Sequence, residues 1–191
     1  EHSAIDPKPR GAPAVCLDIE NGDEVWRIDG LRFGTRWGGQ AIIGDSVITG
    51  FSTYDNTIVA VGKGPSELTV TGPDTSVPLG TDVLLTGTIM DVSPGTKDPE
   101  QTLRFPNGVP AISDADMSEW MLYVYKERPI PMASGVTIKI EAIDPNGNYQ
   151  NLGTTTSDMY GNFGFAFDPE VDGTYMIMAS FEGSGAYYGS M

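Results

Sequence analysis

The sequence has little cysteine, histidine or positive charge, and each shortage excludes a class of protein. A single cysteine, Cys16, cannot form an internal disulfide, and a single histidine, His2, leaves too few ligands for a zinc site built from His and Cys. Catalysis by a histidine-activated nucleophile would require His2 to fold back from the terminus, which argues against that enzyme class. With 26 acidic and 11 basic residues the net charge is −15, so the chain repels phosphate and we expect no nucleic-acid partner.

Long apolar runs are also missing, because no stretch approaches the roughly 18 apolar residues that a membrane-spanning helix needs. Glycine and proline are abundant instead, with 24 and 14 residues in a chain of 191. Their share is well above the usual value of about 12% and indicates many turns. Hydrophobic residues make up 39% of the chain and recur in short alternating runs, which argues against disorder. We therefore predict an all-β protein.

The first segment, residues 1–64, contains short strands joined by tight turns. Its strongest signal is the pair Asn21-Gly22 between two alternating runs, because both residues accept a positive φ and this pattern predicts a hairpin. Further short apolar runs follow, and a glycine-rich bridge at 62–65 reads as a linker. We expect about four or five strands in this segment.

The second segment, residues 65–191, continues with strands separated by turns at roughly ten-residue intervals, which predicts a β-sandwich of about seven strands. Phe163, Phe165 and Phe167 alternate with small residues and predict a strand with one aromatic face. Residues 91–110 hold four prolines and two glycines, and we interpret them as a long loop.

One helix near 114–126 is predicted to interrupt the strands. Ser113 can cap its N-terminus, with Asp116 three residues later in an acidic variant of the capping box. An aromatic binding stripe is one interpretation of its apolar residues, but we favour a helix that covers one end or edge of a sheet. These residues recur at helical spacing: Met117, Trp120, Met121 and Val124.

Three motifs of the first segment follow one another in a characteristic order. The first motif, residues 17–26, contains Asn21-Gly22 and Trp26. The second, residues 39–48, contains the pair Ala-Ile followed by a turn. The third, residues 54–61, is a turn with an aspartate that leads into a strand. In this order they resemble one blade of a PQQ-like β-propeller. Such proteins hold a quinone cofactor on the axis of a closed propeller, and a single blade cannot form that axis. We therefore expect no cofactor and no enzymatic activity.

The second segment resembles a bacterial- or archaeal-type immunoglobulin-like module, through the runs 156–165, 168–175 and 181–184. Together with the junction 62–66 and the helix, the chain resembles the C-terminal part of PQQ-like β-propeller surface proteins of methane-producing archaea. The resemblance implies an extracellular, cell-surface location. It also implies a propeller-blade-like sheet over residues 1–64, followed by an immunoglobulin-like sandwich over residues 65–191 with one inserted helix.

A propeller needs about four to eight blades, and a repeat that buries its faces only against neighbours is not stable alone. Three alternatives follow for the first segment. The missing blades were cleaved and stay associated; or the segment pairs with a copy of itself or with the sandwich; or it adds strands to a neighbouring subunit. The start at Glu1 rather than methionine fits a piece of a longer protein.

Candidate site residues are few. Asp144, Asn146 and Asn148 offer alternate oxygens around a glycine, as in part of a calcium loop, but the twelfth position is Thr155 instead of an acid. We favour a hairpin turn there and keep these three as weak calcium candidates. Trp37 lies in a glycine-rich loop and, with its neighbour Arg36 and with Ile5, is a candidate partner contact.

These observations favour an extracellular structural protein that self-assembles into a filament, sheath or surface layer by β-strand addition between copies, with residues 1–61 carrying the contact. Because the chain is acidic, we expect salt or divalent cations to promote assembly. One alternative is a cell-surface adhesin, a binding module for a glycan or another envelope protein. Another is a fragment of a larger PQQ-like propeller protein.

Overall fold

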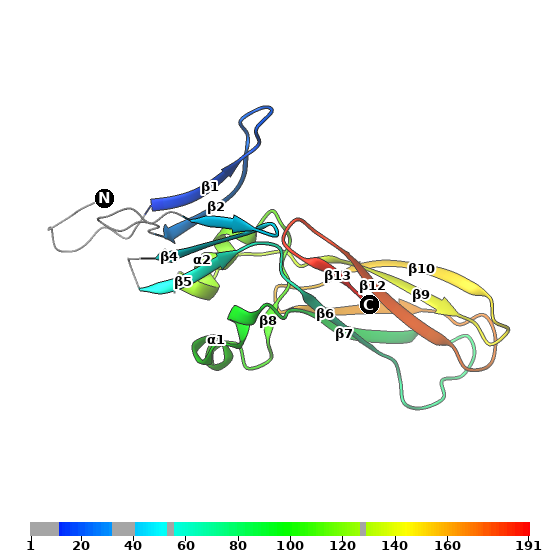
Figure 1. Ribbon diagram of the computed structural model, residues 1–191. Coiled ribbons are helices and arrows are strands. Elements are labelled where there is room, and N and C mark those ends of the chain that lie inside the picture. Colours follow the sequence, from blue (N-terminus) through cyan, green and yellow to red (C-terminus); the bar gives the residue numbers. More distant parts are fainter. Residues whose placement is uncertain (1–11, 32–40, 53–55, 127–128) are drawn as a thin grey trace, which may run out of the picture. The chain divides into compact units, whose positions relative to one another are not determined.

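The computed structural model describes residues 12–31, 41–52, 56–126 and 129–191. It is an all-β fold, as predicted, built from several antiparallel sheets (Figure 1). The chain forms two compact units: unit 1 is Glu1–Lys63 with Met117–Pro131, and unit 2 is Gly64–Asp116 with Met132–Met191. This division lies one residue from the expected boundary and assigns the helical segment to unit 1. No helix in the described ranges is both long and apolar enough to cross a membrane.

Unit 1 begins with a hairpin of β1 (Ala12–Leu17) and β2 (Glu24–Leu31). The turn is closed by the backbone N–H of Asp18, which donates to the carbonyl of Asp23 at 2.8 Å, and Gly22 has a φ of +80°. The hairpin prediction is confirmed, but its turn is the longer connection 18–23, in which Gly22 has a positive φ and Asn21 does not.

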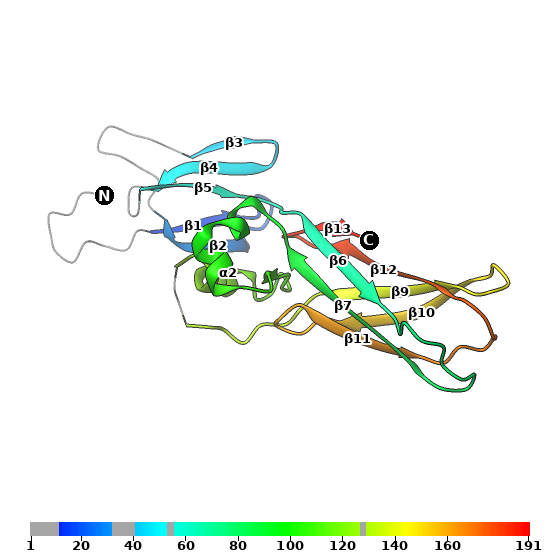
Figure 2. The same ribbon diagram turned by 90° about the horizontal axis from the view of Figure 1, so that it is seen from below.

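The second sheet of unit 1 has the order β3-β4-β5, with the three strands side by side in Figure 2. The strands are β3 (Ile42–Gly44), β4 (Val47–Ser52) and β5 (Thr57–Val61). Asp45 and Ser46 join β3 to β4 with φ values of +49° and +63°, the two positive values of a type I′ turn. The described part of unit 1 therefore holds five strands, in a two-stranded and a three-stranded sheet.

Helix α2 (Met117–Lys126) packs on β2 within unit 1. Trp120 and Val124, one helical turn apart, are fully buried. The helix starts at Met117, so the expected cap at Ser113 is wrong. The Asp116 carboxylate instead accepts from the hydroxyl of Ser113 at 3.0 Å and from the N–H of Ser134 at 2.8 Å, and these bonds hold it outside the helix.

Unit 2 is sandwich-like, with two four-stranded sheets in separate layers (Figures 1 and 2). One sheet has the order β11-β7-β6, with β8 also pairing β7; the other has the order β10-β9-β12-β13. The strand bounds are β6 (Ser66–Thr71), β7 (Val83–Asp91), β8 (Val109–Pro110), β9 (Thr137–Ile143), β10 (Tyr149–Thr156), β11 (Asn162–Phe167), β12 (Met176–Gly183) and β13 (Tyr188–Ser190).

The core of unit 2 comes from alternate residues of both sheets. Phe163 is buried and Phe165 and Phe167 are half-buried, while the residues between them are exposed, which confirms the predicted aromatic face. Gly87 lies opposite Phe163, and a Cβ atom there would come within 2.4 Å of the Phe163 ring. Fully buried aliphatic residues complete this core: Leu85, Ile89, Ile138, Ile140 and Ala142.

The segment 91–110 is not the long loop that its prolines suggested. It contains a 3₁₀ helix (Pro94–Lys97) and helix α1 (Pro99–Arg104), and then β8 pairs with β7. Pro94 and Pro99 each stand at the start of a helix, where proline loses no backbone hydrogen bond and its fixed φ suits the first turn. The prolines therefore begin helices here.

Candidate assembly surfaces

The β3–β4–β5 sheet of unit 1 has an uncovered apolar face. Its register places Ile42 beside Thr49 and Ala60, and Phe51 beside Ile58, so these side chains project from one face. Ile42 is 71% exposed, Ile58 78% and Phe51 46%. A contiguous exposed apolar face of this kind marks an interaction surface.

The opposite face of the same sheet is also apolar and is covered only in part, because Ile43 on that face is 76% exposed. Ile48, Val59 and Val61 are half-buried and Ser52 is fully buried. Strands that are apolar on both faces are typical of sheets buried on both sides. Among the described residues, the sheet therefore leaves large apolar side chains exposed on both faces, more of them on the face of Ile42, Phe51 and Ile58.

Strands at the edges of the sheets accompany this face. In the described part of unit 1, β3 and β5 each pair with β4 alone, and β1 pairs with β2 alone. Strand β5 is Thr-Ile-Val-Ala-Val, without charge or proline. Natural edge strands are usually protected by charges, prolines or bulges, so an uncharged edge is a template for pairing with another chain.

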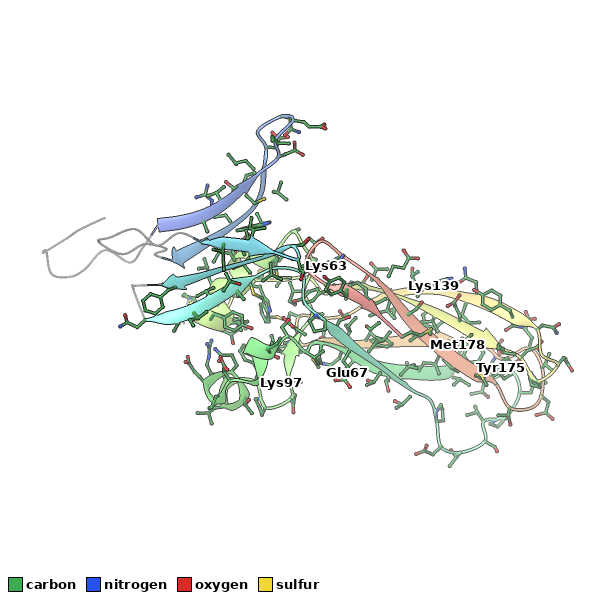
Figure 3. All side chains as sticks on the ribbon, in the orientation of Figure 1. Lys63, Glu67, Lys97, Lys139, Tyr175 and Met178 are labelled. Atoms are coloured by element: carbon green, nitrogen blue, oxygen red, sulfur yellow. The ribbon has the colours of Figure 1, made fainter. Side chains whose placement is uncertain are left out.

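Unit 2 has an apolar groove of about 250 Å³ between the edges of its two sheets. Leu68 and Val70 of β6 line one side, and Ile177, Met178 and Ala179 of β12 line the other, with Met191 at one end. Figure 3 labels Met178 on β12 and Glu67 on β6, the two strands that border the groove.

Strand β13 bridges the two sheets next to the groove. Ser190 pairs with Phe181, and Tyr188 pairs with Gly183. There the hydroxyl of Ser66 on β6 donates to the carbonyl of Tyr188 at 2.8 Å, which ties the sheets together. The rest of β12, Met176–Ser180, pairs with β9 and with no other strand of the described chain.

Two carboxylates of unit 2 tie neighbouring segments together. Asp91 is buried and accepts from the N–H of Ser93 at 2.8 Å, and its burial raises the pKa of its carboxyl. Asp114 accepts from the hydroxyl of Ser184 at 2.8 Å and from the N–H groups of Gly185 and Ala186 at 2.6 and 3.0 Å. These contacts stabilise the fold of unit 2.

The weak calcium candidates form a turn. The Asp144 carboxylate accepts from the N–H groups of Asn146 and Asn148, each at 2.8 Å, and from the side-chain amide of Asn148 at 2.9 Å. The Asn148 amide is the main reason why the pKa of Asp144 is lowered. Asn148 thus presents hydrogens, not an oxygen, to the carboxylate, and the described residues contain no group of three His, Cys, Asp or Glu side chains that could hold a metal. The turn interpretation accounts for all three residues.

The predicted partner contacts Ile5, Arg36 and Trp37 lie outside the described residues. The groove residues Leu68, Val70 and Ile177 were missed by sequence reasoning. Their alternation shows that they face inward. No local signal shows that β6 and β12 are the strands left at the open edge.

Comparisons with known proteins add no relative: no family model, no curated protein and no solved structure matches this chain. The function is therefore argued from the surfaces themselves.

Proposed function

We propose that this protein is an extracellular structural subunit that assembles with copies of itself by β-strand addition, in a filament, sheath or surface layer. The observation that carries the proposal is the β3–β4–β5 sheet, which is apolar on both faces, exposes Ile42, Phe51 and Ile58 on one of them, and is bordered by the uncharged edge strand β5. A second copy can both cover that face and pair with that edge.

The magnitudes favour strand pairing over a simple apolar contact. Full burial of Ile42, Phe51 and Ile58 contributes about 1.5–3 kcal/mol for each side chain. Association costs roughly 4–15 kcal/mol in translational and rotational freedom. Three side chains alone leave little surplus, so a stable contact also needs the backbone hydrogen bonds and further apolar contacts that an added strand supplies.

The titratable groups support a structural role. Lys139 pairs with Glu141 at 2.6 Å on the surface, and Glu24 pairs with Arg27 at 2.6 Å. These two pairs and the carboxylates of the turns account for most of the shifted pKa values in the described residues. Such groups stabilise local structure, and none of them faces the groove.

The net charge of −15 opposes association between copies at low salt. Because added salt shortens the screening length to about 10 Å at 0.1 M, we expect assembly to increase with ionic strength.

The test compares two variants that add the same charge at equally exposed apolar positions. Ile58→Asp places a carboxylate on the uncovered face of unit 1, and Leu103→Asp places one on α1 of unit 2, where Leu103 is 84% exposed. Sedimentation and negative-stain electron microscopy over a salt series should show polymers for the parent chain and for L103D, but not for I58D. Polymers of I58D at the salt concentration that suffices for the parent would overturn the proposal.

A further inference from the structure

We propose that Asn107 is a site of spontaneous deamidation, and that Asn146, in an equivalent turn, is protected from the same reaction by the carboxylate of Asp144. Both asparagines stand in the sequence Pro-Asn-Gly, at 106–108 and at 145–147. The inference goes beyond the proposed function and does not depend on it, because it concerns the chemistry of two surface turns of unit 2.

The reaction needs only the chain itself and water. The backbone nitrogen of the residue after asparagine loses its proton and attacks the side-chain amide carbon, so a nitrogen–carbon bond forms and ammonia leaves. Water then opens the resulting cyclic imide at either carbonyl and gives aspartate or isoaspartate. A following glycine favours the attack, because it has no Cβ atom to hinder the approach. The asparagine and the glycine of both turns are exposed, so water reaches them.

The two turns have the same backbone arrangement. Gly108 donates its N–H to the carbonyl of Phe105 at 3.0 Å, and Gly147 donates to the carbonyl of Asp144 at 2.9 Å. The φ values of the two glycines are +96° and +84°. Each glycine therefore closes a four-residue turn with proline and asparagine at its centre. Because the attacking nitrogen and the turn match, a difference in rate between the two sites must come from their surroundings.

The surroundings differ in the first residue of each turn. One carboxylate oxygen of Asp144 accepts from the N–H groups of Asn146 and Asn148, each at 2.8 Å. Hydrogen bonds from Asn148 are the main reason why the pKa of Asp144 is lowered, and the N–H groups of Asn146 and Gly147 lower it further. The carboxylate therefore lies close to the nitrogen that has to lose its proton. Phe105 begins the other turn, and its side chain carries no charge.

Asp144 opposes the reaction at Asn146 in two ways. Its negative charge disfavours the anion that forms when the Gly147 nitrogen loses its proton. Its two hydrogen bonds also fix the backbone on both sides of Gly147, which opposes the rotation that brings the amide carbon to this nitrogen. In the described chain the Asn107 side chain takes part in no hydrogen bond or ion pair, and the nearest charged residue in the sequence is the cation Arg104.

The hairpin turn of unit 1 holds a third pair, Asn21-Gly22, and it also has a carboxylate at the turn. Asp18 accepts from the N–H groups of Glu20 at 2.7 Å and of Asn21 at 3.4 Å. The side-chain oxygen of Asn21 accepts from the N–H of Asp23 at 2.8 Å, which holds this side chain in place. We expect this pair to be protected as well.

Deamidation at Asn107 changes both the charge and the backbone. Each event takes the net charge of the chain from −15 to −16. Isoaspartate also adds one carbon to the backbone just before β8, where the fully buried Val109 pairs with Asp91. A deamidated copy therefore differs from the parent chain in its charge and in the turn that leads into β8.

The test follows all three asparagines in one sample of the folded parent chain, incubated at mildly alkaline pH in water labelled with heavy oxygen. Newly formed carboxylates keep the label, and peptide mass spectrometry gives the rate at each site. Because a neighbouring charge shifts a pKa by about one unit or more, Asn107 should react about tenfold faster than Asn146. The same measurement in urea, where the turns are lost, should bring the two rates closer together.

Asp144→Asn is the matched variant, because it removes the charge and keeps an acceptor oxygen for the N–H groups of the turn. Asn146 should then react faster, while Asn107, in the other turn, should keep its rate. The substituted residue precedes Pro145, whose nitrogen carries no hydrogen, so the variant gains no further reactive pair. A melting curve shows that the variant is folded.

Faster reaction at Asn107 in the folded parent chain, together with a faster Asn146 in D144N, supports the proposal. Equal rates at the two sites in the folded parent chain overturn it. A rate difference that stays the same in urea also overturns it, because the preference would then belong to the sequence and not to the turns. An unchanged rate at Asn146 in D144N overturns the protection by Asp144.

Discussion

Isoleucine residues in strands have opposite surroundings in the two units. Ile138 and Ile140 of β9 in unit 2 are fully buried, whereas Ile42 and Ile58 of unit 1 are 71% and 78% exposed. All four lie in short β-branched runs that look alike in the sequence. They differ in what lies opposite: β9 faces a second sheet, and the corresponding face of β3–β4–β5 is uncovered. The comparison shows that strands can pair without burying their apolar side chains. This is the case for Ile42 and Ile58 in the β3–β4–β5 sheet of unit 1.

The largest expected effect sharpens this comparison with one substitution made in each unit. Ile140→Ala should destabilise unit 2 by about 2–5 kcal/mol, because it removes buried methyl groups and leaves a cavity. Ile58→Ala should change the free energy of unfolding of the isolated chain by less than about 0.5 kcal/mol, because the side chain is already in water. Urea unfolding below the salt concentration of assembly measures both. A comparable loss in I58A would mean that unit 1 buries this face within the chain.

The next effect contrasts a glycine from each unit. A Cβ atom at Gly87 would lie 2.0 Å from the carbonyl oxygen of Thr69 and 2.4 Å from Phe163, so Gly87→Ala should cost about 1–3 kcal/mol through overpacking. Gly44 in unit 1 has no atom within 4 Å of such a Cβ, and Gly44→Ala should be nearly neutral. Thermal unfolding of the two variants side by side checks the difference. Equal melting temperatures would show that the tight packing at Gly87 relaxes without cost.

The smallest effect concerns two carboxylates of unit 2 whose pKa values shift in opposite directions from the ordinary value of 3.8. Burial raises the pKa of Asp91, so its contribution to stability falls as the pH rises through the folded value. Hydrogen bonds from Asn148 and other groups lower the pKa of Asp144, so its contribution is present above 3.8 and is lost as the pH falls through the folded value.

Asp91→Asn should therefore gain stability relative to the parent chain on going from about pH 3 to pH 7, and Asp144→Asn should lose it. Urea unfolding at both values of pH gives the sign for each variant. Shifts of the same sign in the two variants would contradict the surroundings assigned to one of the carboxylates.

Local chemistry made several elements predictable. Gly22 adopts the positive φ that the Asn21-Gly22 pair favours, and the alternation around Phe165 gives one buried face. Each of these features depends on residues within one turn or one strand, where φ preferences and the period of two act directly.

Other elements were missed because their cause lies elsewhere in the chain. Helix α2 begins at Met117, later than predicted, and the Asp116 carboxylate just before it accepts from the distant N–H of Ser134. Helix α1 was missed because Pro99 reads equally well as a loop residue and as the first residue of a helix. The groove was missed because an edge strand and a central strand can have the same alternation.

By itself, the sequence determined the all-β class, the hairpin turn at Gly22, the inward face of β11 and the acidic character of the molecule, because these follow from side-chain chemistry and short-range backbone preference. The tertiary structure decided which strands stand at an edge, which apolar side chains stay exposed, and which strands border the groove of unit 2. These properties depend on contacts between residues far apart in the chain, and burial becomes defined only when the opposing surface is in place.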